Sequence, residues 1–196
     1  MNKNSLKSVA TEVINLEINA LKVLKKSINK NFDKAVNTIV NCQSKIILCG
    51  VGKSGLIAAK IASTLSSVGS PAFSLSANDC LHGDLGSITR KDILILISNS
   101  GKSEEIIPII KFANRNKVKL IGIVSKKNSF LYKGSDIKIL LPEVKESGLG
   151  VVPTSSTSIQ LAIGDALAVA ALKKKQFSKY DFSRLHPGGN LGKQLK

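Results

Sequence analysis

Residues 46–55 read IILCGVGKSG and contain the strongest local signal for the fold. The first four residues are apolar, which is typical of a short strand buried on both faces. The glycines that follow have the spacing G-x-G-x-x-G, and apolar periodicity over Leu56–Val68 indicates a helix directly after them. Glycines allow close approach of a ligand to the backbone, and a helix N-terminus favours an anion. The stretch therefore predicts an α/β fold whose first loop faces a ligand.

The same alternation continues through the rest of the chain. Four further short apolar runs are Ala72–Leu75, Ile93–Ile97, Leu120–Val124 and Ile137–Leu141. Segments of helical length lie between most of them, as at Ile106–Ala113, and a last long helix is predicted over Ile159–Leu172. Strands that alternate with helices and are almost continuously apolar predict a five-stranded parallel, doubly wound sheet of the flavodoxin-like type, flanked by helices.

The first forty or so residues have a different pattern. Apolar residues recur there at spacings of three and four, which indicates one face of a long amphipathic helix: Leu6, Val9, Val13, Leu16, Ala20 and Leu24. A shorter helix is predicted over Phe32–Val40. The whole chain is expected to be a single domain in which residues 1–43 form a helical hairpin, 44–175 the α/β core and 176–196 a tail that completes the site.

Composition excludes several classes of protein. The chain has 196 residues and 43% hydrophobic residues, enough for a core, so wholesale disorder is excluded. Its two longest stretches without a charge, Ile61–Asn78 and Ser147–Gly164, are interrupted by Ser, Gly and Pro, so we predict no membrane span. The N-terminus has no apolar signal region, and the three cysteines have no C-x-x-C spacing. We expect a cytoplasmic protein without a disulfide framework or zinc ribbon.

The charge balance is strongly basic, with 29 Lys and Arg against 13 Asp and Glu, a net charge of +16. A nucleic-acid partner is nevertheless not expected, because aromatic residues make up 4% and Trp is absent. The basic residues are spread along the chain, and 26 of the 29 are Lys, whereas groove-reading proteins rely on Arg. A positive field would still speed the capture of a small anionic substrate.

Ligands of such sheets bind beyond the carboxyl ends of the strands, so the loops there are the candidate site. The third strand is followed by Ser98, Ser100 and Ser103, and the fifth by a hydroxyl cluster at 154–158. Hydroxyls at strand-to-helix turns form a nest for a phosphate monoester. Ser103 also fits a helix N-cap, and the glycine motif leaves a dinucleotide site open, with Asp79 placed to bind a ribose. Three such loops favour a small phosphorylated ligand over a nucleotide.

Three further residues are candidates for proton transfer. His82 and His186 are the only histidines, and both lie in glycine-rich irregular segments, where the backbone is often shaped around a ligand. Histidine is the side chain best suited to carry protons near neutral pH. Glu146 follows the fifth strand and belongs at the same sheet edge, although a solvated loop carboxylate is the plainer interpretation.

Taken together, the motifs point to one family. In chain order they are Gly52–Gly55, His82–Gly86, Ser98–Gly101, Pro153–Thr157, Gly164–Ala168 and His186–Gly189. From about Leu6 to Lys193 the chain resembles the sugar isomerase (SIS) domain of bacterial arabinose-5-phosphate isomerases. The resemblance implies interconversion of ribulose 5-phosphate and arabinose 5-phosphate, the supply step for Kdo in lipopolysaccharide. It also implies a homotetramer whose sites are shared between subunits, with His186 reaching a neighbour's site.

The resemblance implies two sets of site residues. The catalytic positions are Lys53, Glu105, Glu146 and His186. The substrate-binding positions are Gly52, Ser54, His82, Ser98, Ser100, Ser103, Thr154, Ser155, Ser156 and Thr157. From these positions we hypothesise that Glu146 or Glu105 moves the proton between C1 and C2. Glu146 is preferred because Glu105 would lie near the phosphate. His186 opens the ring or protonates an oxygen, Lys53 stabilises the oxyanion and His82 orients hydroxyls.

Two departures from relatives shape the expectations. Many relatives continue into a pair of CBS domains. We expect no CBS domain in this chain, which resembles the short form of the family with the SIS domain alone. Some relatives have a metal-binding His where this sequence has Ser76. We therefore predict no metal, and isomerisation needs no redox cofactor. The alternatives are a non-catalytic SIS module that senses a sugar phosphate and another phosphosugar isomerase, with a nucleotide-binding protein last.

Overall fold

One parallel sheet of five strands organises the chain, and the computed structural model describes residues 5–188. The last part of the predicted tail, 189–196, lies outside the described residues.

The strand order is β2-β1-β3-β4-β5. The strands are β1 (Ile46–Gly50), β2 (Ala72–Ser76), β3 (Ile93–Ser98), β4 (Lys119–Val124) and β5 (Ile137–Leu140). Each neighbouring pair is parallel, and Gly50 at the end of β1 lies opposite Ile97 on β3. The predicted doubly wound sheet is confirmed, and its strands begin and end within one residue of the apolar runs.

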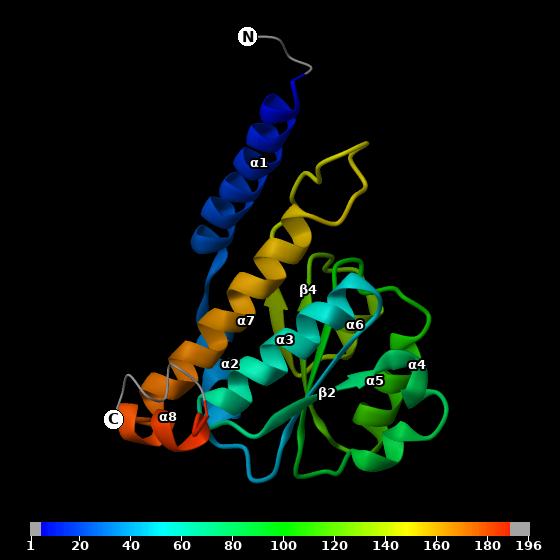
Figure 1. Ribbon diagram of the computed structural model, residues 1–196. Helices are drawn as coiled ribbons and strands as arrows, with labels where there is room; N and C mark the ends of the chain where they lie inside the picture. Colours follow the sequence, from blue (N-terminus) through cyan, green and yellow to red (C-terminus); the bar gives the residue numbers. More distant parts are fainter. Residues whose placement is uncertain (1–4, 189–196) are drawn as a thin grey trace.

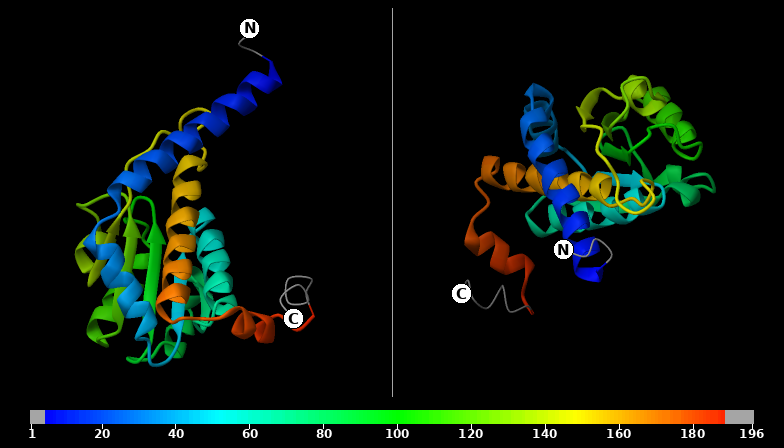
Figure 2. Two further views of the ribbon diagram at one scale, coloured as in Figure 1. Left: turned by 90° about the vertical axis from the view of Figure 1, so that its left-hand side faces the viewer. Right: turned by 90° about the horizontal axis from the view of Figure 1, so that it is seen from above.

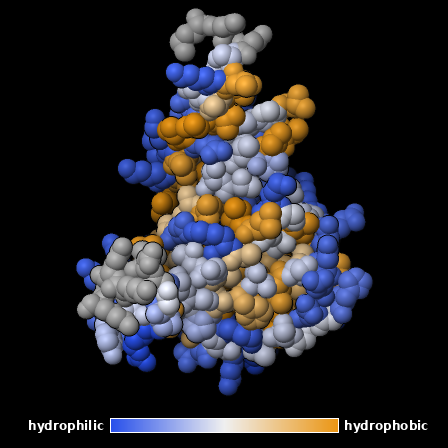
Figure 3. Space-filling view, viewed as in Figure 1, coloured by the Kyte–Doolittle hydropathy of each residue, from blue (hydrophilic) through white to orange (hydrophobic). Residues whose placement is uncertain are grey.

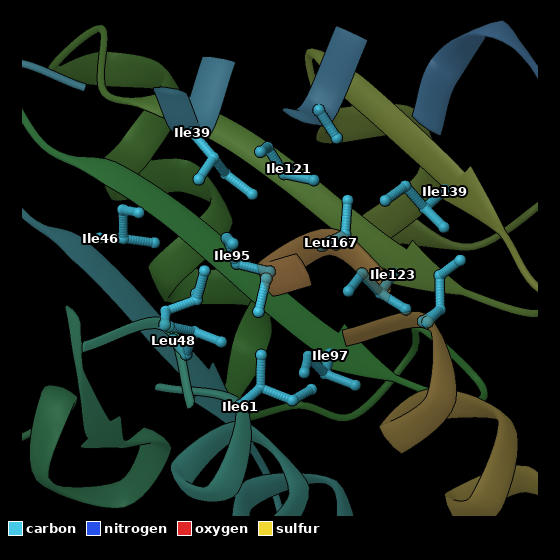
Figure 4. Packing of buried hydrophobic residues seen from close by; sticks show 14 of the residues in the cluster. Ile39, Ile46, Leu48, Ile61, Ile95, Ile97, Ile121, Ile123, Ile139 and Leu167 are labelled. Atoms are coloured by element: carbon cyan, nitrogen blue, oxygen red, sulfur yellow. The ribbon is translucent and has the colours of Figure 1, made fainter. Parts of the chain in front are cut away.

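Helices cover both faces of the sheet (Figures 1 and 2). The helices that follow the N-terminal pair are α3 (Lys53–Ser67), α4 (Ala77–Cys80), α5 (Ile106–Arg115), α6 (Phe130–Gly134), α7 (Ser155–Lys174) and α8 (Lys179–Leu185), with a 3-10 turn over Asp84–Ser87. Alternate strand residues point to opposite faces. Ile95 and Ile97 therefore pack with α3 and α7, whereas Leu94 and Leu96 pack with α5. Figure 4 shows the larger of these two clusters, with Ile61 and Leu167 reaching it from the helices.

Helix α7 lies at the centre of the first face and contacts α1, α2 and α3. It approaches α3 very closely at Gly164, where an added Cβ would overlap Cδ1 of Ile61. The ammonium of Lys60 joins the two helices by an ion pair of 2.5 Å with Asp165. Among the described residues, α7 alone is long and apolar enough to span a membrane, and half of that stretch is buried. Its place in the core accounts for its apolar composition.

The N-terminal helices do not form the predicted hairpin. Helix α1 (Leu6–Ser27) continues into α2 (Lys30–Val40) without doubling back, and both contact α7 (Figure 1). The apolar side of α2 is buried against α7 and β5, which leaves no apolar surface for α1 to cover. Only the C-terminal half of α1 is anchored, through the buried residues Ala20 and Leu24. Apolar periodicity identified both helices correctly, but it does not say which neighbour covers them.

Candidate active site

The loop after β1 places Lys53 at the carboxyl edge of the sheet. Gly52 has a positive φ of 58°, which a side chain would strain, and it is the N-cap of α3. A Cβ on Gly55 would lie 2.8 Å from the carbonyl oxygen of Gly50, so the helix begins directly against the end of β1. As a result the exposed Lys53 and the half-buried Ser54 occupy the first turn of α3.

The loop after β3 presents serine hydroxyls that can donate. The Oγ atom of Ser98 accepts from the backbone N–H of Gly101 at 3.0 Å, and that of Ser100 accepts from Lys102 at 3.2 Å. In both bonds the serine oxygen is the acceptor, so its own proton remains available to an anion. The predicted N-cap role of Ser103 is wrong, because Glu105 occupies the N-cap of α5 without a side-chain cap. Since β1 and β3 are neighbours, this loop lies beside the Lys53 loop.

Glu146 is bound to the start of α7 and is not a solvated loop carboxylate. Its Oε2 atom accepts from the backbone N–H of Thr154 at 2.9 Å, from the Thr154 hydroxyl at 3.2 Å and from the N–H of Ser156 at 3.3 Å. Burial raises the pKa of the Glu146 carboxyl, but the hydrogen bonds from Ser156 and Thr154 outweigh it, and the net pKa is lowered. Glu146 thus already satisfies two of the first amides of α7.

Two hydroxyls of the cluster at 154–157 are already engaged in hydrogen bonds within the chain. The hydroxyl of Thr157 donates to the carbonyl of Thr154 at 2.8 Å, and Thr154 itself is bonded to Glu146. Ser155 is fully buried, and its Oγ has no hydrogen-bond partner among the described residues. The hydroxyls of Thr154 and Thr157 are thus engaged within the chain, and Ser155 is the hydroxyl of this cluster that has no partner among the described residues.

A hollow of about 280 Å³ opens on the other side of the β1 loop, towards the end of β2. Gly52 and Leu56 line it from α3, and Ser74, Ser76 and Asn78 line it from β2 and α4. His82 follows α4 at the same edge of the sheet and is exposed. The β3 loop thus offers hydroxyl donors, and the hollow on the other side of the β1 loop is lined partly by polar side chains.

His186 does not join this group within one chain. Helix α7 has 20 residues, which is about 30 Å at 1.5 Å per residue. At its far end the ammonium of Lys175 binds the carbonyl of Gly69 and the hydroxyl of Ser70, just before β2 begins. Helix α8 follows there, at the amino edge of the sheet (Figure 1). Its C-cap, His186, stacks on the Phe182 ring at 3.9 Å.

The SIS domain family model matches residues 39–170, which include the whole sheet and most of α7. The chain belongs to the SIS domain family. Among solved structures, the E. coli CFT073 protein c3406 in complex with arabinose 5-phosphate superimposes with a TM-score of 0.90 at 34% identity. The match covers 95% of this chain and 100% of that chain.

Curated relatives carry a more specific name. The arabinose 5-phosphate isomerase KdsD of Francisella tularensis is 44% identical over 190 residues, which cover 95% of this chain and 58% of the relative. KdsD of Escherichia coli K12 is 42% identical over 185 residues, covering 94% and 56%. This SIS domain therefore spans less than two thirds of the length of these relatives.

No metal cluster is visible in the described part of this SIS domain. Within residues 5–188, no three His, Cys, Asp or Glu side chains gather where they could share an ion. Ser76, at the end of β2, has a local role instead. Its oxygen accepts from the N–H of Asp79 at 3.3 Å and so caps α4.

Gln160 is a buried polar residue next to the first turn of α3, and it is not among the residues predicted from the sequence. The Ser54 hydroxyl donates to Oε1 of Gln160 at 3.1 Å, which ties the start of α3 to α7. The sequence does contain a signal for this role, because Gln160 is the one polar residue within the apolar run Ile159–Ile163. A polar residue in the middle of a core helix needs a partner, and the partner lies on a neighbouring element.

Proposed function

We propose that this SIS domain interconverts D-ribulose 5-phosphate and D-arabinose 5-phosphate through an enediol intermediate, in the supply of Kdo for lipopolysaccharide. The observation that carries the proposal is the match to c3406 in complex with arabinose 5-phosphate, which extends over the whole of that chain. The names of the curated relatives point to the same reaction. The free thiols of Cys42, Cys49 and Cys80 fit a reducing compartment, and we place the protein in the cytoplasm.

The substrate phosphate is proposed to bind the β3 loop. Ser98 and Ser100 can both donate there, because their oxygens accept from backbone amides. Lys53, in the first turn of α3, is the proposed partner of the oxygen that becomes negative in the enediolate. His82, exposed beside the hollow, is proposed to orient the sugar hydroxyls. Ser103 and the 154–157 cluster complete the proposed binding set.

Glu146 is the proposed proton shuttle between C1 and C2, with Glu105 as the alternative. One oxygen of Glu146 is held by α7, and the lowered pKa keeps the carboxyl ionised at neutral pH. Glu105 adjoins the β3 loop, where a bound phosphate would disfavour a second anion. Exchange of the C2 proton of arabinose 5-phosphate with D₂O separates the two. Glu146→Gln should abolish exchange, and full exchange by this variant would assign the shuttle to Glu105.

His186 is proposed to serve the site of a neighbouring copy in a homotetramer. About 30 Å of α7 separates its segment from the Lys53 loop of the same chain, which supports a shared site. Exposed apolar side chains that suit another copy lie on one face of α1, at Ile14, Ile18 and Leu21, and Figure 3 shows apolar side chains along that helix.

Mixed oligomers test the shared site. A His186→Ala chain and a Lys53→Ala chain, each inactive alone, are unfolded together and refolded at equal amounts. Random pairing then forms intact sites in about one quarter of positions, and activity returns to that fraction. No recovery, with oligomers of normal size, would mean that both residues serve one site from one chain.

The reaction itself is tested by proton NMR with ribulose 5-phosphate in EDTA, without added cofactor. The appearance of arabinose 5-phosphate is the expected result. If ribulose 5-phosphate raises the melting temperature but no new sugar phosphate appears, the protein is a binding module. The catalytic roles proposed for Lys53, Glu146 and His186 would then be wrong.

A further inference from the structure

A buried amide links the starts of α3 and α7. Gln160 is 1% exposed, and its Oε1 accepts the proton of Ser54 at 3.1 Å. Its Nε2 has no hydrogen-bond partner within residues 5–188. A buried polar group without a partner costs about 1–3 kcal/mol, so packing alone does not explain an amide here.

The bond to Gln160 determines what the Ser54 hydroxyl can still do. A serine hydroxyl has one proton to donate and two lone pairs that accept. Ser54 gives its proton to Gln160, so towards a ligand it can only accept. The serines of the β3 loop are in the opposite state, because Ser98 and Ser100 accept from amides and keep their protons.

These two states match the two ends of a sugar phosphate. A phosphate dianion offers acceptors only, so it is bound by Ser98 and Ser100 and not by Ser54. A sugar hydroxyl can donate to the Ser54 oxygen, which is adjacent to Lys53 in the first turn of α3. Ser98 and Ser100 in the β3 loop and Ser54 in α3 thus favour one orientation of the substrate. The phosphate lies at the β3 loop and the reacting carbons lie at the β1 loop.

We propose that Gln160 is a positioning residue that keeps Ser54 as an acceptor for a substrate hydroxyl and so fixes the orientation of the sugar phosphate. The identity of the sugar rests on the function proposed above. The residue acts through Ser54, and it does not itself touch the substrate.

Gln160→Met tests this, because methionine keeps the side-chain length and removes the acceptor. The freed proton of Ser54 can then turn towards a phosphate. Ser54 keeps its lone pairs in this variant, but its hydroxyl is no longer held in the orientation that points them towards the sugar. We expect the KM for ribulose 5-phosphate to rise about tenfold, which equals about 1.4 kcal/mol, with kcat within twofold of wild type. Inorganic phosphate, the probe of the phosphate subsite, should inhibit at least as strongly as in the wild type.

Three further variants separate positioning from packing. Gln43→Met makes the same change at an exposed position and should leave both constants unchanged. Gln160→Glu keeps an acceptor for Ser54 and should restore most of the affinity. In a Ser54→Ala background, Gln160→Met should add nothing to the KM. An equal loss of affinity for sugar phosphate and inorganic phosphate, or a full effect without the Ser54 hydroxyl, would overturn the proposal.

The test also separates this inference from the proposed reaction. If the wild type does not isomerise ribulose 5-phosphate, the same variants are compared by the rise in melting temperature with arabinose 5-phosphate and with inorganic phosphate. A selective loss of the sugar-phosphate response in Gln160→Met supports the inference even though the reaction is refuted. A wild type whose melting temperature rises with neither ribulose 5-phosphate nor arabinose 5-phosphate overturns both.

Discussion

Replacing Asp92 by asparagine removes a carboxylate that ties together the amino ends of β1 and β3. The side chain of Asp92 is fully buried and pairs with the ammonium of Lys45 at 3.0 Å. It also accepts from the backbone N–H of Thr89 at 2.6 Å and from the Thr89 hydroxyl at 2.9 Å. These bonds lie at the sheet edge opposite the candidate site, so the substitution tests stability without touching the chemistry.

The magnitude follows from the pKa of Asp92. Burial raises this pKa, but hydrogen bonds from Thr89, Ser44 and Lys45 outweigh it, and the pKa is lowered from 3.8 to about 2. That difference corresponds to about 2.4 kcal/mol of stability from the ionised form. A lowered pKa stabilises the fold above the unfolded-state value, and this stability is lost as the pH falls through about 2. At pH 3 about half of it should remain.

Urea unfolding of wild type and Asp92→Asn at pH 7 and pH 3 is the assay. The variant should lose about 2 kcal/mol at pH 7 and about half as much at pH 3. Glu143→Gln is the matched control, because that carboxylate is 66% exposed in its pair with Lys126 and should contribute less than about 1 kcal/mol. An equal loss at both pH values would contradict this prediction, since the effect would then not depend on the charge of Asp92.

Two other substitutions probe helix α7. Gly164→Ala places a methyl group against Cδ1 of the buried Ile61, closer than van der Waals contact allows. This overpacking should lower the free energy of unfolding in urea by about 1–3 kcal/mol. An unchanged urea midpoint would mean that α3 moves away freely. Glu146→Gln should destabilise the fold more at pH 7 than near pH 3, because the lowered pKa of Glu146 gives stability that disappears on protonation. A pH-independent loss would assign the effect to packing.

The strands and the loops of the candidate site could be predicted from local signals in the sequence. Apolar runs and glycine turns are local signals, so β1, the Gly52 turn and helix α3 could be read from ten consecutive residues and the periodic segment after them. Parallel strands bring their carboxyl ends to one edge, and the loops bearing Lys53 and Ser98 therefore meet there. This much follows from topology alone.

The pairing of the polar side chains, in contrast, depends on how whole helices and loops pack together. The hydrogen bond between Ser54 and Gln160 joins residues 106 apart in the sequence, and it depends on how closely α3 packs on α7. The same holds for Glu146, whose carboxylate binds the start of α7, and for α1, which extends away from α2. The length of α7 likewise carries His186 to the opposite edge. Such pairings depend on distances and angles between whole elements, and a linear pattern of apolar and polar residues does not encode them.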